Sequence, residues 1–253
     1  MMGWIAGPIR LVRDFRFKRF SAWAVFDPEL DSTEAHRSQT RRGSPCRGWA
    51  VLTLALVGLL GTAASAPFFE DFEKTPVGKV PDSIMVLDGD FSVRDVDGNH
   101  CLELAADPIG GFGALVGPGG MTACDVSARI WAAPTGKRFP EFGIGANDAG
   151  GATLLVTPGV NAIALRVGEK TIATAPFSWR PSSWTFVRMQ VWTHDGKWFV
   201  RGKAWNTGDR KPAQWMIDAP LPKAPNAGRA SVWGNDYSER PIRFDDISVI
   251  RVE

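Results

Sequence analysis

Short apolar runs alternate with clusters of glycine, proline, asparagine and aspartate from residue 67 to the end of the sequence. Such runs, repeated roughly every ten residues, are typical of β-strands. No long stretch keeps the period of about 3.6 residues that an amphipathic helix shows. The pattern predicts an all-β domain, folded as a two-sheet antiparallel jelly-roll sandwich. The expected strands are Phe91–Asp95, Cys101–Ala105, Asp125–Ala132, Glu141–Ala146, Thr153–Thr157, Ala162–Val167, Thr171–Ala175, Thr185–Trp192, Trp198–Trp205 and Phe244–Val252.

A different pattern precedes this domain. Three arginines between residues 41 and 47 come before an apolar run from Trp49 to Leu60, and small residues ending in Ala-Ser-Ala at 64–66 follow. A basic region, an apolar region and an Ala-x-Ala site together form the pattern of an export signal. We predict a signal peptide helix over residues 41–66 and an extracytoplasmic domain over 67–253, in the periplasm, at the cell surface or secreted. The alternative is an uncleaved anchor, although the run is shorter than the about 20 apolar residues of a spanning helix.

The basic charge of the sequence lies in its first 66 residues. Of 29 Lys and Arg and 27 Asp and Glu, 9 and 5 lie there, so 20 and 22 remain in residues 67–253, a net charge of −2. Binding of a nucleic acid backbone by the domain is therefore not expected. Residues 1–40 are interpreted as an N-terminal extension, either disordered or the product of a start assigned too far upstream. Their arginines and aromatic residues also suit a segment that binds membrane or nucleic acid.

One predicted hairpin provides a candidate binding surface. Thr185–Trp192 and Trp198–Trp205 flank an Asp-Gly turn. If Trp192 pairs with Phe199, one face is a plain core face, whereas the other mixes aromatic rings with arginine, glutamine and lysine and suits a solvated, ligand-facing surface. Aromatic rings beside hydrogen-bonding groups match a sugar ring, although tryptophans in strands also fill cores. The candidate ligand-binding residues are Arg188, Gln190, Trp192, Arg201, Lys203 and Trp205.

Cysteine usage predicts one covalent bridge. Cys46 lies in the leader, which leaves Cys101 and Cys124 in the domain. Two cysteines in an exported chain most simply form a disulfide, here closing a loop of about 23 residues and contributing on the order of 3 kcal/mol. The alternative is two buried free thiols.

The two ends of the domain resemble a known group. Phe69-Glu70-Asp71-Phe72-Glu73 is similar to the first strand of concanavalin A-like lectin and glucanase jelly rolls, and residues 243–249, Arg-Phe-Asp-Asp-Ile-Ser-Val, are similar to their last strand. Residues 184–191 and the hairpin after them are similar to the penultimate strands. Laminin-G-like modules and keto-disaccharide hydrolase-like domains share this layout. The resemblance implies a concanavalin A-like fold for residues 67–253 and says little about activity.

The same resemblance implies a structural calcium ion. In related sugar-binding modules, acidic residues of the first and last strands bind calcium, which takes six to eight oxygen ligands. The alternative is that these acids are solvated or pair with Arg243 and Arg251. The matching metal ligands would be Asp71, Glu73, Asp245 and Asp246, with Glu70 beside them.

The predicted domain lacks the catalytic motifs that were sought in it. In residues 67–253, neither the E-x-D-x-x-E string of retaining glucanases nor the G-x-S-x-G nucleophile motif occurs, and Gly110-Gly111-Phe112-Gly113 is interpreted as a turn between strands. We therefore expect a non-catalytic protein that binds a glycan or polysaccharide and meets the membrane only through an uncleaved signal segment. The alternatives are a hydrolase of the keto-disaccharide type, using acids such as Glu141 or Asp148, and an envelope module that binds proteins.

Overall fold

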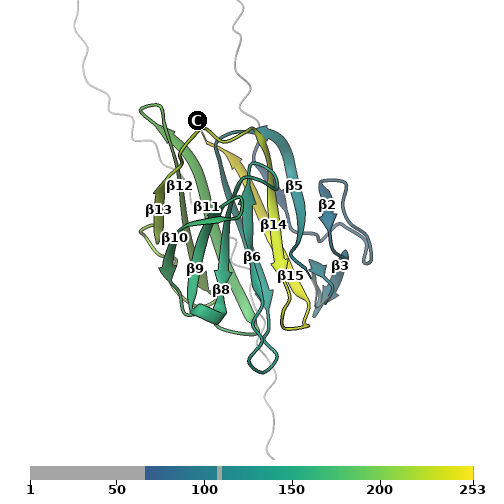
Figure 1. The fold of residues 1–253 in the computed structure, drawn as a ribbon. Coiled ribbons are helices and arrows are strands. Elements are labelled where there is room, and N and C mark those ends of the chain that lie inside the picture. Colours follow the sequence, from purple (N-terminus) through teal and green to yellow (C-terminus); the bar gives the residue numbers. More distant parts are fainter. Residues whose placement is uncertain (1–65, 107–109, 253) are drawn as a thin grey trace, which may run out of the picture. The chain divides into compact units, whose positions relative to one another are not determined.

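The computed structural model describes residues 66–106 and 110–252, which form two antiparallel sheets packed face to face (Figure 1). The predicted all-β jelly-roll sandwich is confirmed. The predicted extension and nearly all of the predicted signal peptide lie outside the described residues. Within the described part, no helix is long and apolar enough to cross a membrane.

The larger sheet has eight strands, in the order β13-β12-β11-β6-β15-β4-β3, with β1 also pairing with β15. Their bounds are β1 Phe68–Glu70, β3 Phe91–Val96, β4 Asn99–Leu104, β6 Cys124–Ala132, β11 Ser183–His194, β12 Lys197–Asn206, β13 Ile217–Pro220 and β15 Ile242–Arg251.

The smaller sheet has seven strands, in the order β10-β9-β8-β7-β14-β5-β2. Their bounds are β2 Ile84–Asp88, β5 Phe112–Met121, β7 Glu141–Ala146, β8 Ala152–Thr157, β9 Ala162–Val167, β10 Lys170–Pro176 and β14 Gly228–Asn235, with one 3₁₀ turn, Pro158–Val160, between β8 and β9.

The β11–β12 hairpin has the register that the sequence predicts, with Trp192 opposite Phe199. Along β11, buried and half-exposed residues alternate because successive side chains of a strand point to opposite faces. Val187, Met189 and Val191 are fully buried and pack against the smaller sheet's inner side chains in the common core. The polar side chains of the hairpin therefore lie on the outer surface of the larger sheet.

All ten predicted strands are present, but four strands were missed: β2, β5, β13 and β14. In particular, the predicted turn at residues 110–113 is wrong, because β5 already begins at Phe112. Both β5 and β14 are rich in glycine, which is depleted in strands and resembles turn sequence. Their pairing with each other is what makes them strands.

The last strand, β15, changes partner in its middle. On one side it pairs with β4 through Ile242–Phe244 and then with β1 through Ile247–Val249, while β6 follows the other side throughout. The β6 register shifts between Asp245 and Ser248, and Asp246 has a positive φ of 49°. This bulge turns the two adjacent aspartates toward the outer surface of the larger sheet, next to β6.

Candidate functional site

The six candidate ligand residues lie together on the outer surface of the larger sheet, which we call the cationic face. Across the strands, Arg188 is opposite Lys203, and Gln190 is opposite both Arg201 and Asp125. The face is completed by Trp215, which comes from the segment that joins β12 to β13. It comprises Asp125, Phe186, Arg188, Gln190, Trp192, Phe199, Arg201, Lys203, Trp205, Lys211 and Trp215.

A buried carboxylate organises the middle of the cationic face. Asp125 Oδ1 accepts a hydrogen bond from Arg188 Nε at 2.9 Å, and Oδ2 accepts one from Arg188 Nη2 at 2.7 Å. Gln190 Nε2 also donates to Oδ2, at 3.2 Å, and Gln190 Oε1 accepts from Arg201 Nε at 2.7 Å. This chain of contacts holds both guanidinium groups in defined positions. A two-pronged arginine–carboxylate pair is among the stronger polar contacts in proteins.

Trp215 lies among three cations. The distance from its ring centroid is 4.7 Å to Lys203 Nζ, 4.8 Å to Arg201 Cζ and 5.5 Å to Arg188 Cζ. Lys203 is buried and donates to the Pro212 carbonyl at 2.8 Å. Burial lowers the pKa of Lys203, and the nearby charges of Lys211 and Arg188 lower it further. The face thus concentrates positive charge around an indole ring.

Sequence reasoning missed Asp125 and Trp215. Asp125 is the second residue of β6, and its role depends on β6 lying beside β11. Trp215 lies outside any strand, so no alternating pattern assigns it to a face. The sequence signal that could have led to Asp125 and Trp215 was the alternation of arginine and tryptophan in the hairpin, because those side chains need partners.

The two predicted stacking tryptophans already have ring partners. Trp205 stacks on Phe186 with centroids 5.3 Å apart and planes at 8°, and Lys211 Nζ lies 5.5 Å from its ring centroid. Trp192 stacks on Phe199 at 5.1 Å, and Arg201 Cζ lies 4.7 Å from its ring centroid. These contacts leave ring edges, rather than free ring faces, for a ligand.

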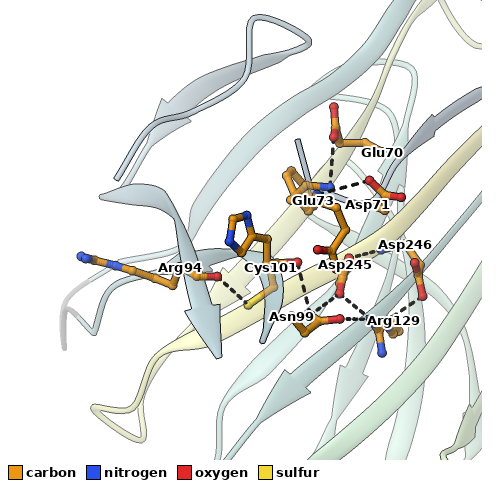
Figure 2. A network of polar contacts seen from close by, with 11 residues as sticks. Glu70, Asp71, Glu73, Arg94, Asn99, Cys101, Arg129, Asp245 and Asp246 are labelled. Atoms are coloured by element: carbon orange, nitrogen blue, oxygen red, sulfur yellow. Dashed lines mark hydrogen bonds and ion pairs between the residues drawn. The ribbon is translucent and has the colours of Figure 1, made fainter. Parts of the chain in front are cut away.

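Two of the four acids with a predicted calcium role, Asp245 and Asp246, contact a guanidinium instead (Figure 2). Buried Asp245 accepts hydrogen bonds through Oδ2 from Arg129 Nη2 at 2.6 Å and from Asn99 Nδ2 at 2.8 Å. Arg129 Nε forms an ion pair with Asp246 Oδ2 at 2.8 Å, and its guanidinium lies 4.5 Å from the Trp184 ring centroid. Burial raises the pKa of Asp245 to about 6, and the charge of Arg129 partly opposes that rise.

These residues do not fit a calcium ion. Glu70 accepts from the Phe72 N–H at 3.1 Å and from Ser83 Oγ at 3.0 Å, and Asp71 accepts from the Glu73 N–H at 3.3 Å. Arg129 already supplies a positive charge between Asp245 and Asp246. In residues 66–106 and 110–252, no group of three or more His, Cys, Asp and Glu side chains is arranged to hold a metal ion. The first and last strands do lie side by side, but their carboxylates bind an arginine and backbone N–H groups.

The predicted disulfide is not formed. Cys101 and Cys124 are both free and buried, and burial raises the pKa of each thiol to about 12. Cys124 lies opposite Arg251, whereas the β4–β15 register places Cys101 beside Asp245. Six residues of β15 therefore separate the two positions, more than about 15 Å along the strand. A disulfide needs Cα atoms within about 7 Å.

Neither acid considered for hydrolysis stands in a catalytic pair with the other. Glu141 begins β7 and faces Arg166 at 3.8 Å, whereas Asp148 follows the other end of β7 and accepts from the Arg229 N–H at 2.8 Å. The length of β7 separates them by about 17 Å. The two carboxyl groups of a glycosidase lie about 5–9.5 Å apart.

No model of a known protein family matches the sequence, and no curated protein sequence matches it. Solved structures do match the fold. Lectin II from Ulex europaeus aligns with a TM-score of 0.53 and 12% identity over 75% of this chain and 100% of the lectin. A sialidase aligns with a TM-score of 0.52 and 13% identity over 75% of this chain, but over only 19% of the sialidase. These likenesses confirm the predicted concanavalin A-like fold.

Proposed function

We propose that this chain is an exported, non-catalytic glycan-binding protein whose cationic face holds an acidic glycan. The observation that carries the proposal is the uncompensated charge of that face. Asp125 is held by Arg188, and in the part of the chain that the structure describes no carboxylate forms an ion pair with Arg201, Lys203 or Lys211. Even Asp218, which is exposed and opposite Arg201 on β13, forms none with it.

The chemistry of the face suits a sugar acid. Arg201 is half-exposed and Lys211 exposed, so both can reach a carboxylate or sulfate, and such charge-assisted hydrogen bonds are strong. The edges of Trp192 and Trp205 offer apolar surface beside them. Because Gln190 and Trp215 already hold Arg201 in place, little of its side-chain freedom is lost on binding.

Two further observations support the proposal. The fold is shared with a lectin and with part of a sialidase, although a shared fold alone does not determine function. The basic, apolar and Ala-Ser-Ala segments of residues 41–66 favour export, which would bring the domain to extracellular polymers. Export itself is tested by the N-terminal sequence of the protein recovered from its native compartment, which should begin after Ala64 or Ala66.

Binding is tested by calorimetry with the full chain and two forms of one polymer, polygalacturonate and its fully methyl-esterified form. We expect binding of the free acid only. Arg201→Gln and Lys211→Gln should each weaken it about tenfold, because a hydrogen bond to a charged group contributes about 1.5 kcal/mol or more. Lys170→Gln, the same charge change on an exposed edge strand of the smaller sheet, is the matched control and should bind normally.

Three results would contradict the proposal. Absence of binding to polygalacturonate, alginate and chondroitin sulfate would remove the acidic-glycan assignment. Equal affinity for the esterified polymer would show that the charges are not used. Equal affinity for a single-stranded oligonucleotide would show a surface that attracts any polyanion rather than a glycan site.

A further inference from the structure

Trp233 lies on the outer surface of the smaller sheet, in a setting unlike that of the tryptophans of the cationic face. Trp233 lies on β14, opposite Gly113 of β5 and Gly143 of β7. A Cβ atom added at Gly113 would lie 2.6 Å from Trp233 Cε3, and one added at Gly145 would lie 3.0 Å from Nε1. The indole therefore rests flat across the backbone of two neighbouring strands, in space that only glycine leaves open.

Its orientation is fixed. Trp233 Nε1 donates to Ser231 Oγ at 2.8 Å, and Ser231 is itself opposite Gly145. Trp233 is partly exposed, and no ring or cation of the described residues stacks on it, whereas Trp192, Trp205 and Trp215 all have such partners. The ring face that points away from the sheet is thus held in place and free of aromatic or cationic contacts.

Polar groups and a groove continue from this ring. Asn235, two residues after Trp233 on β14, is opposite Glu141, which pairs with Arg166 at 3.8 Å. Glu141 also lines a groove of about 540 Å³ whose other lining side chains include Phe139 and the exposed Tyr237. In that groove Arg138 pairs with Glu239, with Nη2 and Oε2 3.1 Å apart. The charged groups here are paired with one another.

We propose that this surface is a second saccharide site, in which a neutral pyranose stacks on Trp233 and the adjoining sugars extend past Glu141 into the groove beside Tyr237. A flat apolar ring bordered by amide, carboxylate and guanidinium groups matches the apolar face and hydroxyl rim of a sugar ring. Paired charges favour a neutral ligand, whereas the cationic face favours an acidic one. The site is separate from the proposed acidic-glycan site, so either can be present without the other.

The test is calorimetry of the full chain with neutral hexasaccharides: cellohexaose, xylohexaose, laminarihexaose and mannohexaose. We expect at least one to bind, Trp233→Ala to weaken that binding at least about tenfold and Trp233→Phe to retain part of it. Trp131→Ala, which removes a half-exposed tryptophan of β6 that belongs to neither proposed site, is the matched control and should bind normally. A single cooperative urea-unfolding transition, shown by Trp233→Ala and Trp233→Phe as by the wild type, guards against misfolding as the cause.

Binding that survives Trp233→Ala, or that Trp131→Ala weakens equally, would overturn the proposal. So would failure of all four hexasaccharides to bind. Polygalacturonate binding measured on the same variants separates the two sites. It should be unaffected by Trp233→Ala, so loss of neutral binding alone concerns the Trp233 site, and loss of acidic binding alone concerns the cationic face.

Discussion

The two outer surfaces of the sandwich both carry tryptophan, but they use it differently. On the cationic face, every tryptophan that we predicted for stacking packs against a neighbouring ring or lies under an arginine or lysine. On the smaller sheet, Trp233 lies on glycine backbone and its outer ring face has no such partner. The first arrangement positions charges, and the second positions an apolar surface.

The difference shows that residue type alone does not make a stacking platform. Arginine beside tryptophan looks favourable for sugar binding, but the guanidinium is itself attracted to the ring face and lies over it. A free ring face needs small neighbours that let the indole lie flat. In this protein those neighbours are Gly113 and Gly145.

The largest expected effect tests how far the larger sheet's outer surface depends on its own ion pairs. Arg129→Ala would leave Asp245, whose side chain is 1% exposed, without its cation. Breaking such a buried pair costs about 3–5 kcal/mol of unfolding free energy. Arg166→Ala on the smaller sheet is the control, since its partner Glu141 is 30% exposed and the loss should stay within about 1 kcal/mol. Urea unfolding measures both, and equal losses would contradict the comparison.

The next effect concerns pH. The pKa of Asp245 rises from 3.8 to about 6 on folding because the carboxyl is buried. The folded protein therefore binds this proton more tightly, so the group lowers stability above about pH 6 and stops doing so as the pH falls to about 4. The cost at neutral pH is on the order of 3 kcal/mol.

Asp245→Asn removes this titration while keeping the shape of the side chain. The unfolding free energy of the wild type minus that of the variant should rise by on the order of 3 kcal/mol between neutral pH and about pH 4. Chemical denaturation at several pH values measures the difference. A difference that stays constant with pH would show that Asp245 titrates normally.

A smaller effect tests whether the Trp233 ring packs directly on the backbone at Gly113. Gly113→Ala places a methyl group against the indole and should cost about 1–3 kcal/mol as the ring is lifted. Gly111→Ala is the matched control, because a Cβ there meets nothing within 4 Å, and it should change stability by no more than about 0.5 kcal/mol. Denaturation and tryptophan fluorescence measure both variants. Equal stability and equal emission would show that the ring does not rest on Gly113.

The last prediction is that a reductant has no effect on the stability of the protein. Because Cys101 and Cys124 are free, adding a reductant should leave the melting temperature unchanged. In the native protein both thiols should react slowly with a thiol reagent, since they are buried and the pKa of each is raised to about 12. After denaturation both should react at once. A melting temperature that falls when reductant is added would show that Cys101 and Cys124 form a disulfide after all.

Alternating patterns were enough to predict ten strands, the β11–β12 register and the surface on which Arg188 and Arg201 lie. Those features are local, because a strand's side-chain alternation and a two-residue turn are set by neighbouring residues. The same reasoning failed for β5 and β14, where glycines leave room for neighbouring side chains: Gly113 for Trp233 and Gly234 for Leu104. It also failed for the acids near Asp245, because Arg129 reaches them from β6, more than a hundred residues earlier.

The sequence by itself determined that residues 67–253 form an all-β domain, since many short apolar runs separated by turn residues are typical of strands that pack around a single core. Only the tertiary structure decided how each polar or aromatic group is used. Strand order sets which side chains meet: it separates Cys101 from Cys124, brings Asp125 to Arg188 and lays Trp233 on Gly113. Contacts between strands that are distant in sequence produce no periodic pattern of residues. The sequence therefore shows which polar and aromatic side chains are present, but not which of them contact one another.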